Sequence, residues 1–96
     1  MADRADVAIH AVVSGRVQGV GFRYFVQNAG RQMELVGNVS NAPDSTVDII
    51  VEGEAGKMAD FIKQVEKGPS LSRVQRLDVL DIPVQGKYSS FLIEGW

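Results

Sequence analysis

The chain has 96 residues, of which 45% are apolar and 23% charged, and its formal net charge is −2. This length suits one domain, so we expect residues 1–96 to form a single unit with a disordered tail over residues 1–6. The sequence has no cysteine and one histidine, which excludes a disulfide framework and thiol catalysis and argues against a zinc site. A pI near 5.2 argues against general nucleic-acid binding.

The N-terminal third predicts a strand, a glycine-rich loop and a helix. Apolar residues alternate over residues 7–13, which indicates a strand. Glycines then interrupt the pattern, which is typical of a loop. Apolar spacings of three and four begin at Phe22 and end near Met33, so we expect an amphipathic helix there, locally weakened by Gly30.

The middle of the chain predicts a hairpin followed by a second helix. Residues 35–41 and 46–53 resemble strands, and the turn-forming residues 42–45 join them, so an antiparallel hairpin is expected. A second helical stripe runs from Met58 to Val65. Gly68-Pro69 should end it, because proline cannot continue a helix.

The C-terminal third predicts two more extended segments. Residues 73–84 have imperfect alternation, typical of a bulge, and residues 88–93 indicate a short strand or tail. The order is β-α-β-β-α-β plus a C-terminal strand, an α+β class in which two helices cover one face of a mostly antiparallel sheet. Right-handed crossovers allow the first loop and the hairpin turn to share one edge of the sheet.

The loop from Gly15 to Arg23 carries the strongest functional signal. It leads into a helix N-terminus, where unpaired N–H groups and the helix dipole favour an anion, and Arg23 could add a donor fork. It matches neither the Walker A nor the dinucleotide-binding pattern. From spacing alone, a glycine-rich connection with one solvated arginine is an equally good interpretation. Arg16 is open to both views, as an aid to substrate approach or as a solvated charge.

The segment Gly15–Arg23 resembles the signature of the acylphosphatase family. The family's second element, Gly-x-Val-x-Asn, is matched by Gly37–Asn41, and weaker similarities continue through the chain from Val7 onward. This resemblance implies a ferredoxin-like sandwich. It also implies a hydrolase that cleaves the carboxyl-phosphate bond of acyl phosphates to a carboxylate and inorganic phosphate, with no metal and no cofactor.

The resemblance also implies roles for individual residues. Arg23 matches the family's phosphate-binding arginine, and Asn41 its water-orienting asparagine. The loop amides expected to bind the phosphoryl oxygens are those of Gln18, Gly19, Val20, Gly21 and Phe22. A carboxylate is a good leaving group, so positioning and charge stabilisation suffice for this chemistry.

The sequence departs from the family beside the second element. Asn38 stands where a tryptophan is usual and Ser40 where a basic residue is usual, so we expect altered packing and charge beside Asn41. Asp48 and Glu52 have strand spacing and are expected on a solvated face.

Other functions are compatible with the same pattern. They include a non-catalytic anion- or protein-binding module and the acylphosphatase-like domain of larger carbamoyl-transferring enzymes. An RNA-binding domain would need aromatic and basic residues interleaved on its sheet, a pattern that is not seen. The polar N-terminus has no signal-peptide pattern, so we expect a cytoplasmic protein. We also expect a monomer that acts on a small acyl phosphate, with no nucleic-acid or membrane partner.

Overall fold

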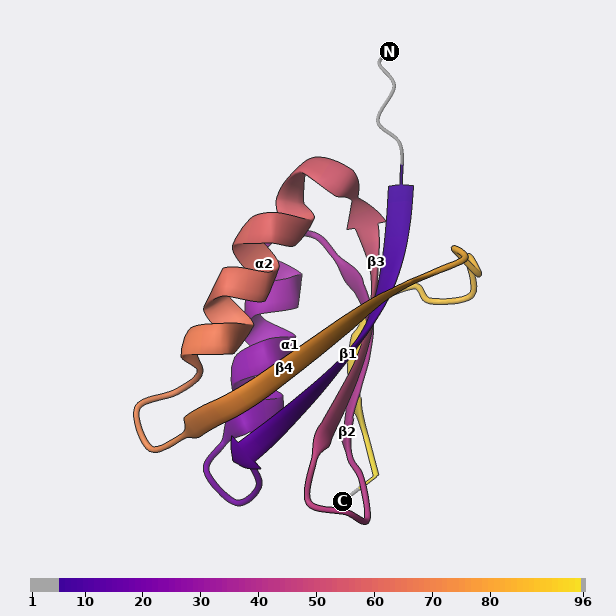
Figure 1. Cartoon of the computed structure of the whole chain (residues 1–96). Helices are drawn as coiled ribbons and strands as arrows, with labels where there is room; N and C mark the ends of the chain where they lie inside the picture. Colours follow the sequence, from indigo (N-terminus) through magenta and orange to yellow (C-terminus); the bar gives the residue numbers. More distant parts are fainter. Residues whose placement is uncertain (1–5, 96) are drawn as a thin grey trace.

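A computed structural model describes residues 6–95 as two layers, a five-stranded sheet with two helices on one face (Figure 1). The elements are β1 (Asp6–Arg16), α1 (Phe22–Gln32), β2 (Val36–Asn41), β3 (Val47–Glu54), α2 (Ala55–Lys67), β4 (Arg73–Ile82) and β5 (Phe91–Glu94). The predicted tail over 1–6 lies outside the described residues except for Asp6, the first residue of β1. No helix in the described range is long and apolar enough to cross a membrane.

The sheet has the strand order β4-β1-β3-β2-β5. β1 runs antiparallel to β3 and β4, β2 runs antiparallel to β3, and β5 runs parallel to β2. Two βαβ units therefore interleave, since β1 and β3 each lie between the strands of the other unit. This confirms the predicted ferredoxin-like α+β sandwich, and the C-terminal extended segment is a fifth strand.

A bulge interrupts the pairing of β1 with β4. Ser14 pairs with Arg76 and the next residue, Gly15, pairs with Val74, so Gln75 has no partner in register. The imperfect alternation of residues 73–84 is explained by this extra residue. Val74, which directly precedes the unpaired Gln75, packs against the core.

The core fills the space between the helices and the sheet, and Gly30 is essential to it. A Cβ atom at Gly30 would lie 2.3 Å from Cδ2 of the fully buried Phe91 ring. That ring also packs on Phe61, at a centroid distance of 6.1 Å. Gly30, expected only as a weak point, is therefore the position where α1 comes close enough to cover β5.

Glu52 corrects a sequence-based expectation. Asp48 is partly exposed, with 40% of its side chain accessible, whereas Glu52 is only 4% exposed. Its Oε2 accepts a hydrogen bond from Gln85 N at 2.8 Å, and its Oε1 accepts one from Gly86 N at 3.2 Å. The solvated-face prediction is wrong for Glu52, because the segment between β4 and β5 folds over the helix-free face of the sheet and buries it.

Candidate active site

The loop between β1 and α1 ends in two glycines with left-handed backbone conformations. Gly19 has a φ of 75° and Gly21 a φ of 79°, values that favour glycine because it has no Cβ. Gly21 is the N-cap of α1, and its carbonyl accepts a hydrogen bond from Phe25 N at 3.0 Å. No side chain caps the helix, and its first turn holds no acidic residue. The positive end of the helix dipole is therefore left uncompensated.

The same loop presents a continuous run of unused N–H donors. Among the interactions within residues 6–95, none of the backbone N–H groups from Gln18 to Tyr24 is donated to a protein acceptor. The side chains of Val17, just before this run, and Phe22, within it, are each only 1% exposed and anchor the loop to the core. The sequence thus buries the apolar side chains of the loop and leaves its donors available to an anion.

The side chain of Gln18 ties this loop to the hairpin turn that follows β2. Its Nε2 donates hydrogen bonds to the carbonyl oxygens of Ala42, at 3.0 Å, and Thr46, at 2.9 Å. These two residues close the turn, since Ala42 N also donates to Thr46 O at 2.9 Å. The expected proximity of loop and turn is confirmed, and Asn41, the residue before Ala42, is held beside the loop.

The turn itself is fixed by Asp44. Its Oδ1 accepts hydrogen bonds from Thr46 Oγ1 at 2.6 Å and from Thr46 N at 3.2 Å. Both bonds hold the pKa of the Asp44 carboxyl below its usual value, and the bond from the Thr46 side chain has the larger effect. Ser45 follows with a φ of 75°, a left-handed conformation that is uncommon for residues other than glycine.

Asn41 carries an unpaired buried acceptor. It is the last residue of β2, where it pairs with Val47, and its Oδ1 is buried without a hydrogen-bond partner. Leaving such an atom unsatisfied costs about 1–3 kcal/mol. An orphaned acceptor at the end of a strand, next to a donor-rich loop, is the arrangement expected where a substrate or a bound water completes the hydrogen bonding.

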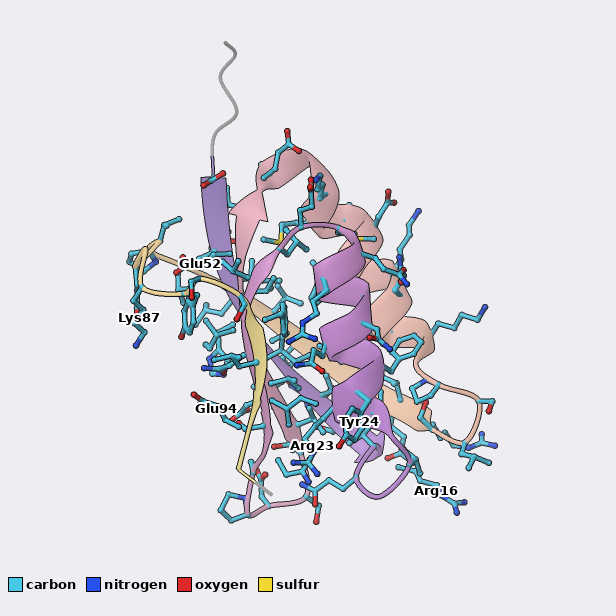
Figure 2. All side chains as sticks on the ribbon, turned by 180° about the vertical axis from the view of Figure 1, so that it is seen from behind. Arg16, Arg23, Tyr24, Glu52, Lys87 and Glu94 are labelled. Atoms are coloured by element: carbon cyan, nitrogen blue, oxygen red, sulfur yellow. The ribbon has the colours of Figure 1, made fainter. Side chains whose placement is uncertain are left out.

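The two arginines of the loop lie on opposite sides of it. Figure 2 shows Arg23 between the start of α1 and the β2–β3 turn, whereas Arg16 extends outward on the far side of the loop. Arg23 is half-buried in the first turn of α1. Throughout the described chain neither guanidinium forms an ion pair or a side-chain hydrogen bond. Arg23 is therefore free to bind an anion at the loop.

The departures from the family lie on the other face of the sheet. Along β2 the buried residues alternate with half-buried ones, which puts Asn38 and Ser40 on the helix-free face and Asn41 on the helix side. Asn38 is opposite Ile50, and Ser40 is opposite Asp48. Their side chains therefore point away from the side chain of Asn41, and the expectation that they change the packing and charge beside Asn41 stays a prediction.

Sequence reasoning missed the role of the Gln18 side chain. Gln18 was expected to act through its backbone amide, and no pattern along the chain links it to a turn 24 residues away. The loop amides, Arg23 and Asn41 were expected together, and the fold does bring their segments to one edge. No group of three or more potential metal-ligating side chains occurs within residues 6–95.

A two-layer α+β sandwich that directs a glycine-rich loop, a helix N-terminus and a lone arginine to one edge defines a phosphate-binding class of protein. The acylphosphatase family model matches residues 9–93. Over 86 residues the chain is 42% identical to an acylphosphatase of Bacillus pumilus, covering 90% of this chain and 96% of that one. The chain belongs to the acylphosphatase family, whose members are hydrolases of acyl phosphates.

Solved structures support the same assignment. The crystal structure of the acylphosphatase from Bacillus subtilis has a TM-score of 0.89 and 35% identity, covering 93% of this chain and 99% of that one. The acylphosphatase from Coxiella burnetii has a TM-score of 0.90 at 29% identity and full coverage of that chain. Full-length HypF, in a phosphate- and nucleotide-bound form, matches with a TM-score of 0.90 and 36% identity, but over only 12% of its length.

Proposed function

We propose that this chain hydrolyses acyl phosphates at the edge of the sheet formed by the β1–α1 loop and the end of β2. The phosphoryl oxygens would be bound by Arg23 and by the amides of Gln18, Gly19, Val20, Gly21 and Phe22. Asn41 would orient the attacking water. The observation that carries the proposal is the buried, unpartnered Oδ1 of Asn41, held beside a run of unused N–H donors by the Gln18 side chain.

The donors suit a transferring phosphoryl group. Its transition state spreads negative charge over three equatorial oxygens, and preorganised amides stabilise that charge without rearranging. The guanidinium of Arg23 adds two parallel donors, which a lysine cannot reproduce. The helix dipole of α1 acts in the same direction, because no acidic side chain offsets it in the first turn.

Asn41 suits a water-orienting role because its Oδ1 can accept a hydrogen bond from water but cannot take a proton at neutral pH. The water oxygen forms a bond to phosphorus as the bond from phosphorus to the acyl oxygen breaks. The carboxylate leaves with the electron pair and requires no proton. The proton lost by water passes to a substrate oxygen or to solvent, which gives inorganic phosphate and a carboxylate.

The role of Arg23 can be tested by inhibition with inorganic phosphate. Arg23→Ala should raise the inhibition constant of phosphate about tenfold or more, the effect of removing charge-assisted hydrogen bonds. Arg23→Lys should recover only part of that loss. Arg31→Ala is a matched control, since this exposed arginine lies in the last turn of the same helix. Equal inhibition constants in the Arg23 and Arg31 variants would contradict the assignment.

A pure binding module would hold phosphate without turnover, so benzoyl phosphate hydrolysis separates the two functions. We propose that this turnover needs no metal and survives a chelator. We also propose that the protein acts as a cytoplasmic monomer on free, small acyl phosphates. Sedimentation at micromolar concentration tests the oligomeric state, and a sedimentation coefficient of a dimer would overturn that part.

A further inference from the structure

The outer edge of β4 is open along the full length of the strand. Within residues 6–95, β4 is the last strand of the sheet on its side and pairs only with β1. The strand at the other end of the sheet, β5, has 4 residues, whereas β4 has 10. A long edge strand presents a row of free N–H and C=O groups with which another chain can pair.

The two halves of β4 differ in how they protect this edge. The half next to the phosphate loop carries Arg73, Arg76 and the bulge at Gln75. Charges and bulges both oppose the pairing of a further strand. The half from Leu77 to Ile82 pairs with β1 without interruption and contains no proline and no basic residue. This second half is therefore the part of the edge that can accept an added strand.

An apolar groove of about 400 Å³ lies along the same half, between β4 and α2. Its walls include Val79 of β4 and Met58 and Ile62 of α2, and the start of β1 lines it as well. Figure 1 shows β4 beside α2 at the front of the sheet. A segment paired with β4 would direct every second side chain to this side of the sheet, so that its apolar residues could cover the groove.

The charges beside the groove are negative. Asp6 and Asp81 line it, and both are exposed. Asp81 forms no ion pair and no side-chain hydrogen bond with the described part of the chain. A second copy of β4 would bring further aspartates to this edge, and like charges on neighbouring strands are unfavourable. A lysine or arginine beside Asp81 would instead be attracted.

We propose that Leu77–Ile82 and the groove form a docking site for another protein, which adds an extended segment to the sheet as a further strand. Residues directly opposite each other in neighbouring strands share a face. The partner residue opposite Val79 is apolar and covers the groove. The next one is apolar and covers Leu80, which is 64% exposed on the other face. The third is a lysine or arginine opposite Asp81, so the partner is recognised by an apolar-apolar-basic triplet.

The docking site is remote from the phosphate loop. Asp81 pairs with Ile9, and β1 continues from there to Arg16 before the loop begins. That stretch is about 23 Å long at roughly 3.3 Å per residue. A bound partner therefore leaves the loop accessible, and this inference does not depend on the proposed hydrolysis.

Two fluorescein-labelled peptides with amidated C-termini serve as probes. They are Thr-Thr-Lys-Leu-Val-Thr-Thr and Thr-Thr-Val-Leu-Lys-Thr-Thr, which present the triplet to β4 in antiparallel and in parallel pairing. Fluorescence anisotropy should show binding of one of them. Methylating alternate backbone nitrogens of that peptide should abolish binding when the methylated edge faces β4. Methylation of the opposite edge should leave binding intact, because only one edge of an added strand pairs with the sheet.

A charge exchange tests the contact with Asp81. Asp81→Lys should weaken binding of the lysine peptide roughly threefold to tenfold, the range for losing an exposed ion pair and gaining a repulsion. The same variant should bind a peptide with glutamate in place of lysine more tightly than wild type does. Glu94→Lys is the matched control, since it makes the same change of charge on β5, the other edge strand. It should leave both affinities unchanged.

Four results would overturn the proposal. They are no binding of either peptide at millimolar concentration, equal binding of the two N-methylated forms, equal effects of Asp81→Lys and Glu94→Lys, and competitive inhibition of hydrolysis by the peptide. A protein dimer that the peptide dissociates would also overturn it, because it would assign this edge to a second copy of the chain.

Discussion

Gln18 donates a side-chain hydrogen bond to the carbonyl of Ala42 at 3.0 Å, across 24 residues of sequence. The bond joins the proposed phosphate loop to the residue that follows Asn41. The proposed phosphate loop and the end of β2 are thus held in one geometry, and small errors in such positioning are costly for phosphoryl transfer.

Gln18→Met keeps a similar volume and removes both donors of the tether. We expect it to lower the free energy of unfolding by about 1–2 kcal/mol and to lower kcat/KM for benzoyl phosphate, because the loop loses its fixed distance to Asn41. Urea unfolding and steady-state kinetics measure the two effects. Gln27→Met is the matched control, since Gln27 Nε2 donates a comparable bond to Phe91 O at 3.0 Å. It should lose stability but keep kcat/KM, and equal kinetic losses would contradict the tether.

Gly30→Ala should destabilise the protein even though alanine is the better helix former. The added Cβ would meet the Phe91 ring at 2.3 Å and 2.6 Å, and overpacking of this kind costs about 1–3 kcal/mol. Gly56→Ala in α2 has no neighbour within 4 Å of its added Cβ and should stabilise by roughly 0.5–1 kcal/mol. Thermal unfolding of the two variants gives the comparison. Stabilisation by both would show that Phe91 does not require Gly30.

Asp44 should make the hairpin turn sensitive to acid. Hydrogen bonds from Thr46 lower the pKa of this carboxyl in the folded protein, so the folded state binds its proton less readily than the unfolded state. The resulting stability is present above the unfolded pKa and is lost as pH falls through the folded pKa. Thr46→Val should raise the Asp44 pKa in an NMR titration. It should also reduce stability at pH 7 more than at pH 2. A loss independent of pH would contradict this account.

The secondary structure could be predicted because each element follows a local pattern. The helical stripe from Phe22 and the alternation over 7–13 gave the correct element types, and the resemblance gave the fold. Glu52 could not be predicted as buried, because its partners come from a segment more than 30 residues away. Phe91, whose ring requires Gly30, lies still farther along the chain from its partner. Contacts between distant segments produce no periodic pattern in the sequence of either segment.

The residues of the candidate site could be proposed from the sequence, whereas the contacts that hold them in place could not. Arg23, Asn41 and the loop glycines belong to short motifs, and the fold brings those motifs to one edge of the sheet. The face on which Asn38 and Ser40 lie follows from strand alternation. The pairing of Arg16 with Arg73 depends on the register after the bulge at Gln75, and the sequence alone does not fix that register.

The most direct measurement is the hydrolysis of benzoyl phosphate by Asn41→Ala, made together with phosphate inhibition and urea unfolding. We predict that kcat falls about 100-fold or more, a loss as large as that of removing one preorganised active-site amide donor. The inhibition constant of phosphate should stay the same. The variant should be at least as stable as wild type, since it removes the buried, unpartnered Oδ1. An unchanged kcat, or a kcat that falls only in proportion to lost stability, would contradict the role of Asn41 and with it the proposed site.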